Sequence, residues 1–237
     1  MTAIHSSFLQ MMRQLRNDSL LLIMLFVPFL AGTIFHFGLP VAESYLTNFF
    51  SVPVILAPYY QLVDVLLSLL TPTILSFVVA LTILEEADDG IVRYLAITPL
   101  GKKGYLISRL GLMTLLAIPL NLFVTSHFSI TELKPSIILA FSVFGAVHGL
   151  VVALMIVALS SNKVEGMAIG KVTSLITVGL FAPYFLSDQL SYLFAAMPSF
   201  WVAKFVIEGQ ILFLILSLTI NVFFICLLFR RFAAKLR

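Results

Sequence analysis

The sequence predicts an all-α integral membrane protein, a single transmembrane domain over residues 1–237 with six transmembrane helices. Hydrophobic residues make up 61% of the chain and charged residues 11%, which is less than half of their usual share in a soluble domain. Six apolar runs each approach the roughly 20 residues that cross about 30 Å of hydrocarbon. The bases flank these runs instead of forming a free patch, so nucleic acid is not an expected partner.

The N-terminal segment, residues 3–16, has the pattern of an amphipathic helix that lies along the membrane surface and contacts lipid. Its apolar face comprises Ile4, Phe8, Met11 or Met12, and Leu15. Asp18 and its neighbours offer an N-cap for the first span, predicted at residues 20–37. A cleaved signal peptide is disfavoured, because the apolar run is long, contains a proline and lacks a small-x-small cleavage site. Residues 38–60 hold three prolines and a single charge, and we expect them to form an outer loop.

The remaining spans are predicted at residues 61–84, 105–126, 136–160, 172–186 and 211–229. Residues 187–210, which contain Pro198 and Trp201 among apolar residues, predict a hairpin that re-enters the outer leaflet without crossing it. With both termini inside, twelve of the fourteen Lys and Arg residues fall on the inner side, and only Lys134 and Lys204 on the outer side. This asymmetry predicts a plasma (inner) membrane protein with both termini in the cytoplasm.

The segment between the second and third spans is densely charged. Residues 84–109 hold four of the eleven acids and four of the fourteen bases. The acids come first and the bases last, an order that suits the two ends of a helix. An apolar face follows from the helical spacing of Ile91, Tyr94, Leu95 and Thr98. We therefore predict a short amphipathic helix from Glu85 to Lys103 outside the bilayer. For any single charge in it, a solvated loop is the alternative.

This segment resembles the permease subunits of the ATP-binding cassette type-2 exporter family. The resemblance rests on an acidic pair, a glycine, an Arg-aromatic-Leu step, a TPL turn and a basic stretch that ends in YLISRL. It implies that the helix is a coupling helix that docks on a cytoplasmic ATPase. The implied ATPase-coupling residues are Glu85, Glu86, Asp88, Asp89, Gly90, Arg93, Tyr94, Leu95, Pro99, Lys102 and Lys103. The implied partners are two cytoplasmic ATP-binding subunits and a second permease subunit, identical or homologous.

The sequence predicts no enzyme active site in this chain. Residues 166–173, GMAIGKVT, have three residues between the glycines where a Walker A motif needs four, and valine follows the lysine. The Asp88-Asp89-Gly90 run lacks the downstream aspartates that a membrane CDP-alcohol phosphotransferase uses to hold metal ions. The four histidines have no metal-ligand spacing. We therefore expect no metal or cofactor on this chain, and expect ATP and Mg on the partner ATPase.

A few polar residues fall inside the predicted spans and are candidates for a substrate path, because polar groups are costly in hydrocarbon. These residues are Asp64, Asn121, His148 and Asn221. The alternatives are an interfacial carboxylate for Asp64 and hydrogen bonds between helices for the other three. We expect Arg109 to extend its guanidinium to the inner surface.

The predicted function is a permease subunit that exports an amphiphilic drug, lipid or peptide by means of a separate ATPase. The apolar spans favour such a cargo. The alternative is a membrane anchor or scaffold that recruits a cytoplasmic partner without transport.

Overall fold

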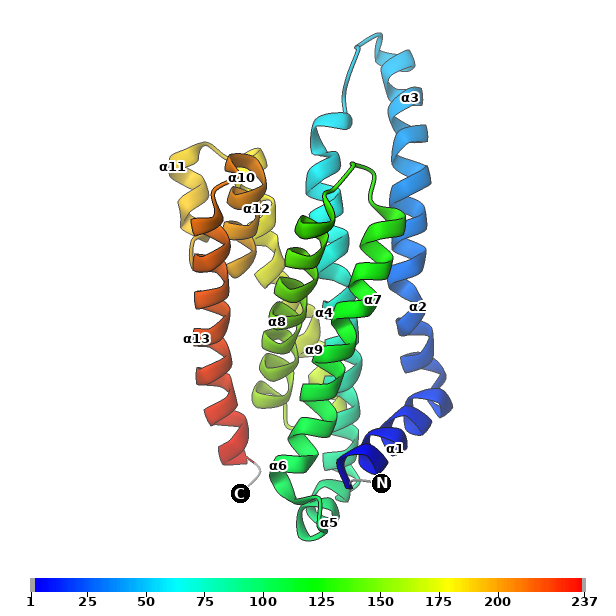
Figure 1. Ribbon diagram of the computed structural model, residues 1–237, viewed down its shortest axis with the longest axis vertical. Coiled ribbons are helices and arrows are strands. Elements are labelled where there is room, and N and C mark those ends of the chain that lie inside the picture. Colours follow the sequence, from blue (N-terminus) through cyan, green and yellow to red (C-terminus); the bar gives the residue numbers. More distant parts are fainter. Residues whose placement is uncertain (1–2, 236–237) are drawn as a thin grey trace.

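The computed structural model describes residues 3–235, and in this range the chain forms helices joined by short turns, without a strand (Figure 1). The predicted all-α class is confirmed. Five helices are long and apolar enough to span a membrane, and they cover Ser19–Phe50, Ala57–Asp88, Gly101–Phe128, Pro135–Leu159 and Ile211–Lys235. Together with the composition, these helices make the chain a multi-spanning membrane protein.

The first spanning helix begins where the sequence predicts. Asp18 is its N-cap, and its carboxylate accepts hydrogen bonds from the N–H groups of Leu20 at 3.0 Å and Leu21 at 3.1 Å. These bonds satisfy donors that the first turn of α2 (Ser19–Thr33) leaves free.

The same helix continues further than predicted. After α2, a π-helical turn, η1 (Ile34–Gly38), leads directly into α3 (Leu39–Phe50). The prediction of a loop from residue 38 was wrong for residues 39–50, which are helical, because Pro40 falls in the first turn of α3, where a missing N–H is tolerated. The outer position of this segment stays a prediction. The helix ends only at Ser51, which adopts the left-handed conformation with φ 53°.

The centre of the bundle is the contact between α4 (Tyr60–Asp88) and α8 (Pro135–Leu159), the two most deeply buried of the long helices. Gly145 and Gly149 of α8 lie against α4 at Pro72. A Cβ at Gly145 would come within 2.8 Å of the Ser68 carbonyl oxygen, and one at Gly149 within 2.7 Å of the Pro72 carbonyl oxygen. Two small residues four apart therefore let the two backbones touch, as in other membrane helix pairs.

Three further helices pack around this centre. α7 (Leu112–Phe128) follows α6 (Gly101–Leu106) and a second π-helical turn, η3 (Ile107–Gly111), and it lies against both α4 and α8. α13 (Ile211–Lys235) packs on α8 from the other side. α2 lies against α4 and α7. Much of α2, α3 and α13 faces outward with large apolar side chains, as expected for helices that border lipid.

The predicted span at residues 172–186 is not among the five long helices. The chain here forms α9 (Lys163–Thr173), a 3₁₀ stretch, η4 (Ser174–Leu180), and a short helix, α10 (Ala182–Phe185). α8 ends near the chain termini and α13 starts at the far end, so these residues carry the chain back along the molecule (Figure 1). The chain changes from α-helix to 3₁₀ helix and back to α-helix, so this segment does not form one regular helix.

Residues 187–210 form a cluster of short helices at the end of the molecule away from the termini (Figure 1). The cluster comprises α11 (Asp188–Ser191), η5 (Tyr192–Phe194) and α12 (Pro198–Glu208), with α12 packed on α13 and η4. It does not run the length of the molecule. Its depth in the outer leaflet stays a prediction.

The opposite end carries both ends of the described chain, together with α1 (Ala3–Asn17) and α5 (Ile91–Ile97) (Figure 1). The predicted N-terminal helix is confirmed, and Ser7, Met11 and Leu15 form its buried face. The face differs from the apolar stripe expected because Ser7 turns inward to a polar cluster described below. The position of α1 at a membrane surface stays a prediction.

Candidate functional site

The charged segment between α4 and α6 projects from the end of the bundle as the short helix α5 (Figure 1). Glycines in the left-handed conformation flank it, Gly90 with φ 72° and Gly101 with φ 61°. A Cβ at either glycine would meet no atom within 4 Å, so the backbone angle and not space favours glycine there. α5 is therefore a separate element, joined on each side by a sharp reversal of the chain.

The single helix predicted from Glu85 to Lys103 was wrong in its bounds. Glu85, Glu86 and Asp88 lie in the last turn of α4, and only residues 91–97 form α5. Neither glycine nor proline occurs between Pro72 and Gly90, so α4 continues through the acids instead of ending ahead of them. Acidic side chains at the C-terminus of a helix interact unfavourably with the helix dipole. Neighbouring basic groups must offset this cost.

Glu86 and Arg109 form a buried ion pair, with exposed fractions of 1% and 0%. The Arg109 Nη2 lies 2.6 Å from Glu86 Oε1, and Nε donates to Glu86 Oε2 at 3.0 Å, so the contact is bidentate. The Tyr105 hydroxyl donates to Glu86 Oε2 at 2.7 Å. The expectation that Arg109 reaches the inner surface was wrong, because a carboxylate lies within its reach inside the protein.

The other side of the Arg109 guanidinium binds the N-terminal helix. Its Nη1 donates to the Ser7 carbonyl oxygen at 2.8 Å and to the Ser7 hydroxyl at 2.9 Å. Arg109 lies in the π-helical turn η3, and turns of this kind occur often at functional sites. One buried side chain thus joins α1, the end of α4 and the start of α7 directly above α5. We call Ser7, Glu86, Tyr105 and Arg109 the arginine cluster.

A second, more exposed set of charges joins α4 to α9. The Lys163 ammonium lies 2.9 Å from Glu85 Oε2 and 3.1 Å from Asp18 Oδ2, and the Lys163 backbone N–H donates to Asp88 Oδ2 at 2.9 Å. Burial alone would lower the pKa of Lys163, but the hydrogen bonds and charges of the two carboxylates raise it. Burial likewise opposes the charge of Asp18, yet its hydrogen bonds with the Leu21 amide and Lys163 lower its pKa.

The surface of α5 carries apolar side chains that the rest of the chain does not cover. Tyr94 is 71% exposed and Ile97 is 84% exposed, one helical turn apart. Ile97 was not among the predicted residues, although its helical spacing from Tyr94 is apparent in the sequence. Leu95 is partly buried, and Asp89, Pro99, Lys102 and Lys103 are exposed. The side chain of Arg93, a predicted coupling residue, lies outside what the structure describes.

Asp64, predicted for a substrate path, holds the loop between α7 and α8. Its carboxylate is 1% exposed and accepts hydrogen bonds from the N–H groups of Ile130 at 2.7 Å and Thr131 at 2.9 Å, and from the Thr131 hydroxyl. The His36 Nδ1 lies 3.0 Å from the Ser129 carbonyl oxygen in the same loop. These contacts give Asp64 a structural role at the end of α4.

We expect Asp64→Ala to lower the free energy of unfolding by about 1–3 kcal/mol, because two partly buried N–H groups and a hydroxyl lose their acceptor. Thermal unfolding of the purified protein in detergent measures this. Glu132→Ala, in the same loop but without a buried acceptor role, is the control. Equal midpoints for the two variants would contradict the role of Asp64.

The other polar candidates are buried in the bundle, and their place on a substrate path stays a prediction. His148 Nδ1 is 3.4 Å from Asn221 Oδ1, which joins α8 to α13. The Thr125 hydroxyl donates to Asn121 Oδ1 at 3.2 Å within α7. His148 and Asn221 thus contact each other between two helices. His148 Nε2 and Asn121 Nδ2 are left without a hydrogen-bond partner among the described residues.

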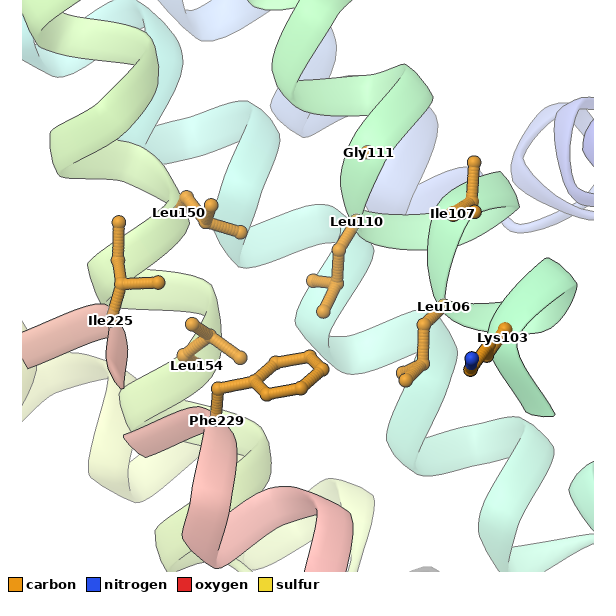
Figure 2. A pocket seen from close by; sticks show the side chains of 9 residues that line it. All are labelled: Lys103, Leu106, Ile107, Leu110, Gly111, Leu150, Leu154, Ile225 and Phe229. Atoms are coloured by element: carbon orange, nitrogen blue, oxygen red, sulfur yellow. The ribbon is translucent and has the colours of Figure 1, made fainter. Parts of the chain in front are cut away.

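An apolar groove opens between η3, α8 and α13, near the end that carries α5 (Figure 2). Its volume is 480 Å³. Its walls include Leu106, Leu110, Leu150, Leu154, Ile225 and Phe229. Lys103 of α6 lies at the edge of the groove beside Leu106 (Figure 2), and the lining itself is almost wholly apolar. The groove therefore has the composition of a site for an apolar group.

No group of three or more metal-ligating side chains occurs among residues 3–235. The carboxylate and the guanidinium of the arginine cluster pair with each other in a closed contact. This end of the molecule thus combines an exposed helix, a buried connection to two spanning helices, and a groove beside them.

The chain was compared with known proteins. A family model described as "Fluoroquinolones export permease protein Rv2686c-like" matches residues 11–229. Two relatives from Mycobacterium tuberculosis, the fluoroquinolones export permease proteins MT2760 of strain CDC 1551 / Oshkosh and Rv2686c of strain ATCC 25618 / H37Rv, are each 28% identical over 194 residues. The match covers 76% of this chain and 75% of each relative. No solved structure matches. The family model covers most of the chain, and the chain belongs to the Rv2686c-like family of fluoroquinolones export permease proteins.

Proposed function

We propose that this chain is the membrane subunit of an ATP-binding cassette exporter and that α5 is its contact with a cytoplasmic ATPase. The observation that carries the proposal is the exposed pair Tyr94 and Ile97 on a helix that projects beyond the spanning helices. Aromatic and aliphatic side chains of this kind form the centres of protein interfaces. The resemblance of residues 84–109 to the coupling segment of type-2 exporter permeases supports the same assignment.

The arginine cluster gives α5 a route to the spanning helices. A displacement of α5 is transmitted through the two chain reversals at Gly90 and Gly101 to the C-terminal end of α4 and the N-terminal end of α6. Because the ion pair of Glu86 and Arg109 closes this loop from inside, α4 and α7 move as one unit instead of separating. Coupling requires the ATPase to contact α5 differently in its two nucleotide states, since equal contacts would shift no equilibrium.

The proposed complex contains two ATPase subunits and two permeases, the second identical or homologous. ATP and Mg bind to the ATPases, and this chain holds no cofactor. We place the complex in the plasma membrane with α5 and both termini in the cytoplasm. The support is the division of bases, because Arg13, Arg16, Lys102 and Lys103 belong to α1 and α6 at one end and Lys134 and Lys204 to the other. The return segment of α9, η4 and α10 then provides a sixth crossing.

The proposed cargo is an amphiphile that moves from the inner side outward. The names of the two relatives assign fluoroquinolones to them, and these compounds are drug-sized aromatic amphiphiles. The apolar groove beside α5 suits a molecule of that kind. A drug is therefore favoured over the lipid or peptide that the sequence left open.

The test replaces the exposed pair by Tyr94→Ala and Ile97→Ala together. We expect the ATPase encoded nearest to this permease, when co-expressed, to copurify at least about tenfold less well, and ATP-dependent efflux to fall equally. Tyr45→Ala is the matched control, because Tyr45 is 74% exposed on α3 at the opposite end. Unchanged copurification and efflux in the double variant would refute the docking role.

The anchor or scaffold alternative makes a different forecast for the same experiment. A scaffold retains the cytoplasmic partner without ATP-dependent movement of any amphiphile. If the intact complex binds its ATPase but shows no nucleotide-dependent efflux in vesicles, the scaffold is favoured over the exporter.

A further inference from the structure

The groove between η3, α8 and α13 has the size of a small-molecule site. Its 480 Å³ lies within the range of about 300–1,000 Å³ for pockets that hold drug-sized ligands. α7 and α13 both pack on α8, and the groove lies between them at the end nearest α5. Leu150 and Leu154 of α8 form its floor and Phe229 of α13 lies across from Leu106 of α6 (Figure 2). A rigid apolar ring system would displace no protein polar group from such walls.

The charge at the groove is basic. Lys103 is exposed and lies at the rim, where its ammonium can meet the polar end of a molecule whose body is in the groove (Figure 2). Arg230 and Arg231 directly follow Phe229 and are exposed at the same end of α13. Of these cations Lys103 belongs to the groove lining, and its positive charge at the rim favours an anionic group there.

We propose that this groove is the entry site of the exporter and that it binds an aromatic amphiphile with one anionic group, whose ring system lies between α8 and α13 and whose anion pairs with Lys103. This inference rests on the proposed function, since it names the cargo of that exporter.

The groove shares its walls with the proposed coupling path. Leu110, which lines the groove, is the neighbour of Arg109, which holds Glu86 and Ser7. Lys103 lies two residues after the reversal at Gly101. A displacement of α5 that moves α6 and η3 therefore changes the width of the groove and the position of its ammonium together. This shared wall favours a transported molecule over a lipid that stays bound.

The single cysteine of the chain makes a site-specific test possible. Cys226 is exposed and lies beside Ile225, which lines the groove. In a Cys226→Ser background, Ile225→Cys places a thiol in the groove, and Val222→Cys places one on the same helix at a position that is 52% exposed and does not line it. The full-length permease is put into phosphatidylcholine nanodiscs, and the rate of modification by N-ethylmaleimide is followed by mass spectrometry.

Two probes separate the ring system from the charge. 1-Anilinonaphthalene-8-sulfonate carries an anion, and N-phenyl-1-naphthylamine has the same rings without it. We expect both to slow modification of Ile225→Cys at least about fivefold and to leave Val222→Cys unaffected. Lys103→Gln should raise the sulfonate concentration needed for protection about fivefold, as for loss of one partly exposed ion pair, and leave the neutral probe unchanged. Lys171→Gln, an exposed lysine of α9, should change neither.

Three results would overturn the inference. Equal protection of Val222→Cys would mean that the probes act through the bilayer. If the sulfonate protects equally well with and without Lys103→Gln, the Lys103 ammonium does not pair with the anion. Protection by phosphatidylglycerol added to the nanodiscs, without a probe, would mean that a lipid occupies the groove.

A transport arm connects the groove to export. With the ATPase present in vesicles, Leu154→Trp fills the groove and should abolish ATP-dependent efflux of the sulfonate, whereas Leu30→Trp, on the outward face of α2, should retain it. Normal efflux by Leu154→Trp would refute the entry site. The thiol experiment needs neither nucleotide nor ATPase, so its failure counts against the groove alone, and failure of the Tyr94 and Ile97 experiment counts against the proposed function alone.

Discussion

Glu86→Ala is expected to lower the free energy of unfolding by about 3–5 kcal/mol, the usual cost when one partner of a buried ion pair is removed. The Arg109 guanidinium would keep its bonds to Ser7 but face an apolar void in place of two carboxylate oxygens. The Tyr105 hydroxyl would lose its acceptor as well. Thermal and denaturant unfolding of the purified permease in detergent measures the change.

A double variant separates stability from coupling. Glu86→Leu with Arg109→Leu removes both charges and keeps the site filled, and such replacements often leave stability unchanged or raised. We expect its unfolding midpoint to approach that of the original chain. ATP-dependent efflux should nevertheless fall at least about tenfold, because the hydrogen bonds of Arg109 to Glu86 and Ser7 no longer join α1, α4 and η3. A double variant with full efflux would show that the arginine cluster has a structural role only.

The control for Glu86 is its neighbour in the sequence. Glu85 is 30% exposed, and its partner Lys163 keeps a second carboxylate, Asp18. Glu85→Ala should therefore cost about 1 kcal/mol or less, as for other exposed ion pairs. If Glu86→Ala costs no more than Glu85→Ala, the buried pair does not hold the helix ends together.

Gly149→Leu should destabilise the protein by about 3 kcal/mol or more, at the upper end of what overpacking costs. A Cβ at this position would lie 2.5 Å from the Ser76 hydroxyl and 2.7 Å from the Pro72 carbonyl oxygen. The backbone oxygen cannot rotate aside, so α8 must move away from α4. Because α7 and α13 both rest on α8, the displacement reaches the whole bundle.

Gly38→Leu is the matched control, since Gly38 is exposed in the first spanning helix and a Cβ there would meet only Ile34 Cγ2, at 3.8 Å. Leucine should be tolerated at this position, with an unfolding midpoint near that of the original chain. A similar loss of stability in both variants would mean that the added side chain itself, and not the contact with α4, explains the effect of Gly149→Leu.

Hydropathy alone predicted much of the fold, because each spanning helix must satisfy its own backbone and cover itself with apolar side chains. The predicted spans at residues 61–84, 105–126 and 211–229 fall inside long helices, and the span at 136–160 runs one residue past a helix that ends at Leu159. The cap at Asp18 was also visible, since a cap depends on residues close in the sequence. The continuation through Gly38 and Pro40 was not, because the adjustment in η1 leaves no composition signal.

The candidate site was harder to predict because its key contacts join distant residues. Arg109 lies 23 positions from Glu86 and 102 from Ser7, and a charge next to a span looks the same whether it reaches water or a buried carboxylate. The location of the charged segment was predicted, and its division into α4, α5 and α6 was not. The assignment of its residues to ATPase coupling stays a prediction.

The 3₁₀ winding of η4 changes how far the return segment reaches. A 3₁₀ helix rises about 2.0 Å per residue against 1.5 Å for an α-helix. The seven residues Ser174–Leu180 therefore cover roughly 14 Å, where an α-helix would need about nine residues for the same distance. A topology search that assumes uniform α-helical pitch will undercount the traverses of this chain along its long axis, and will misjudge on which side its C-terminus emerges.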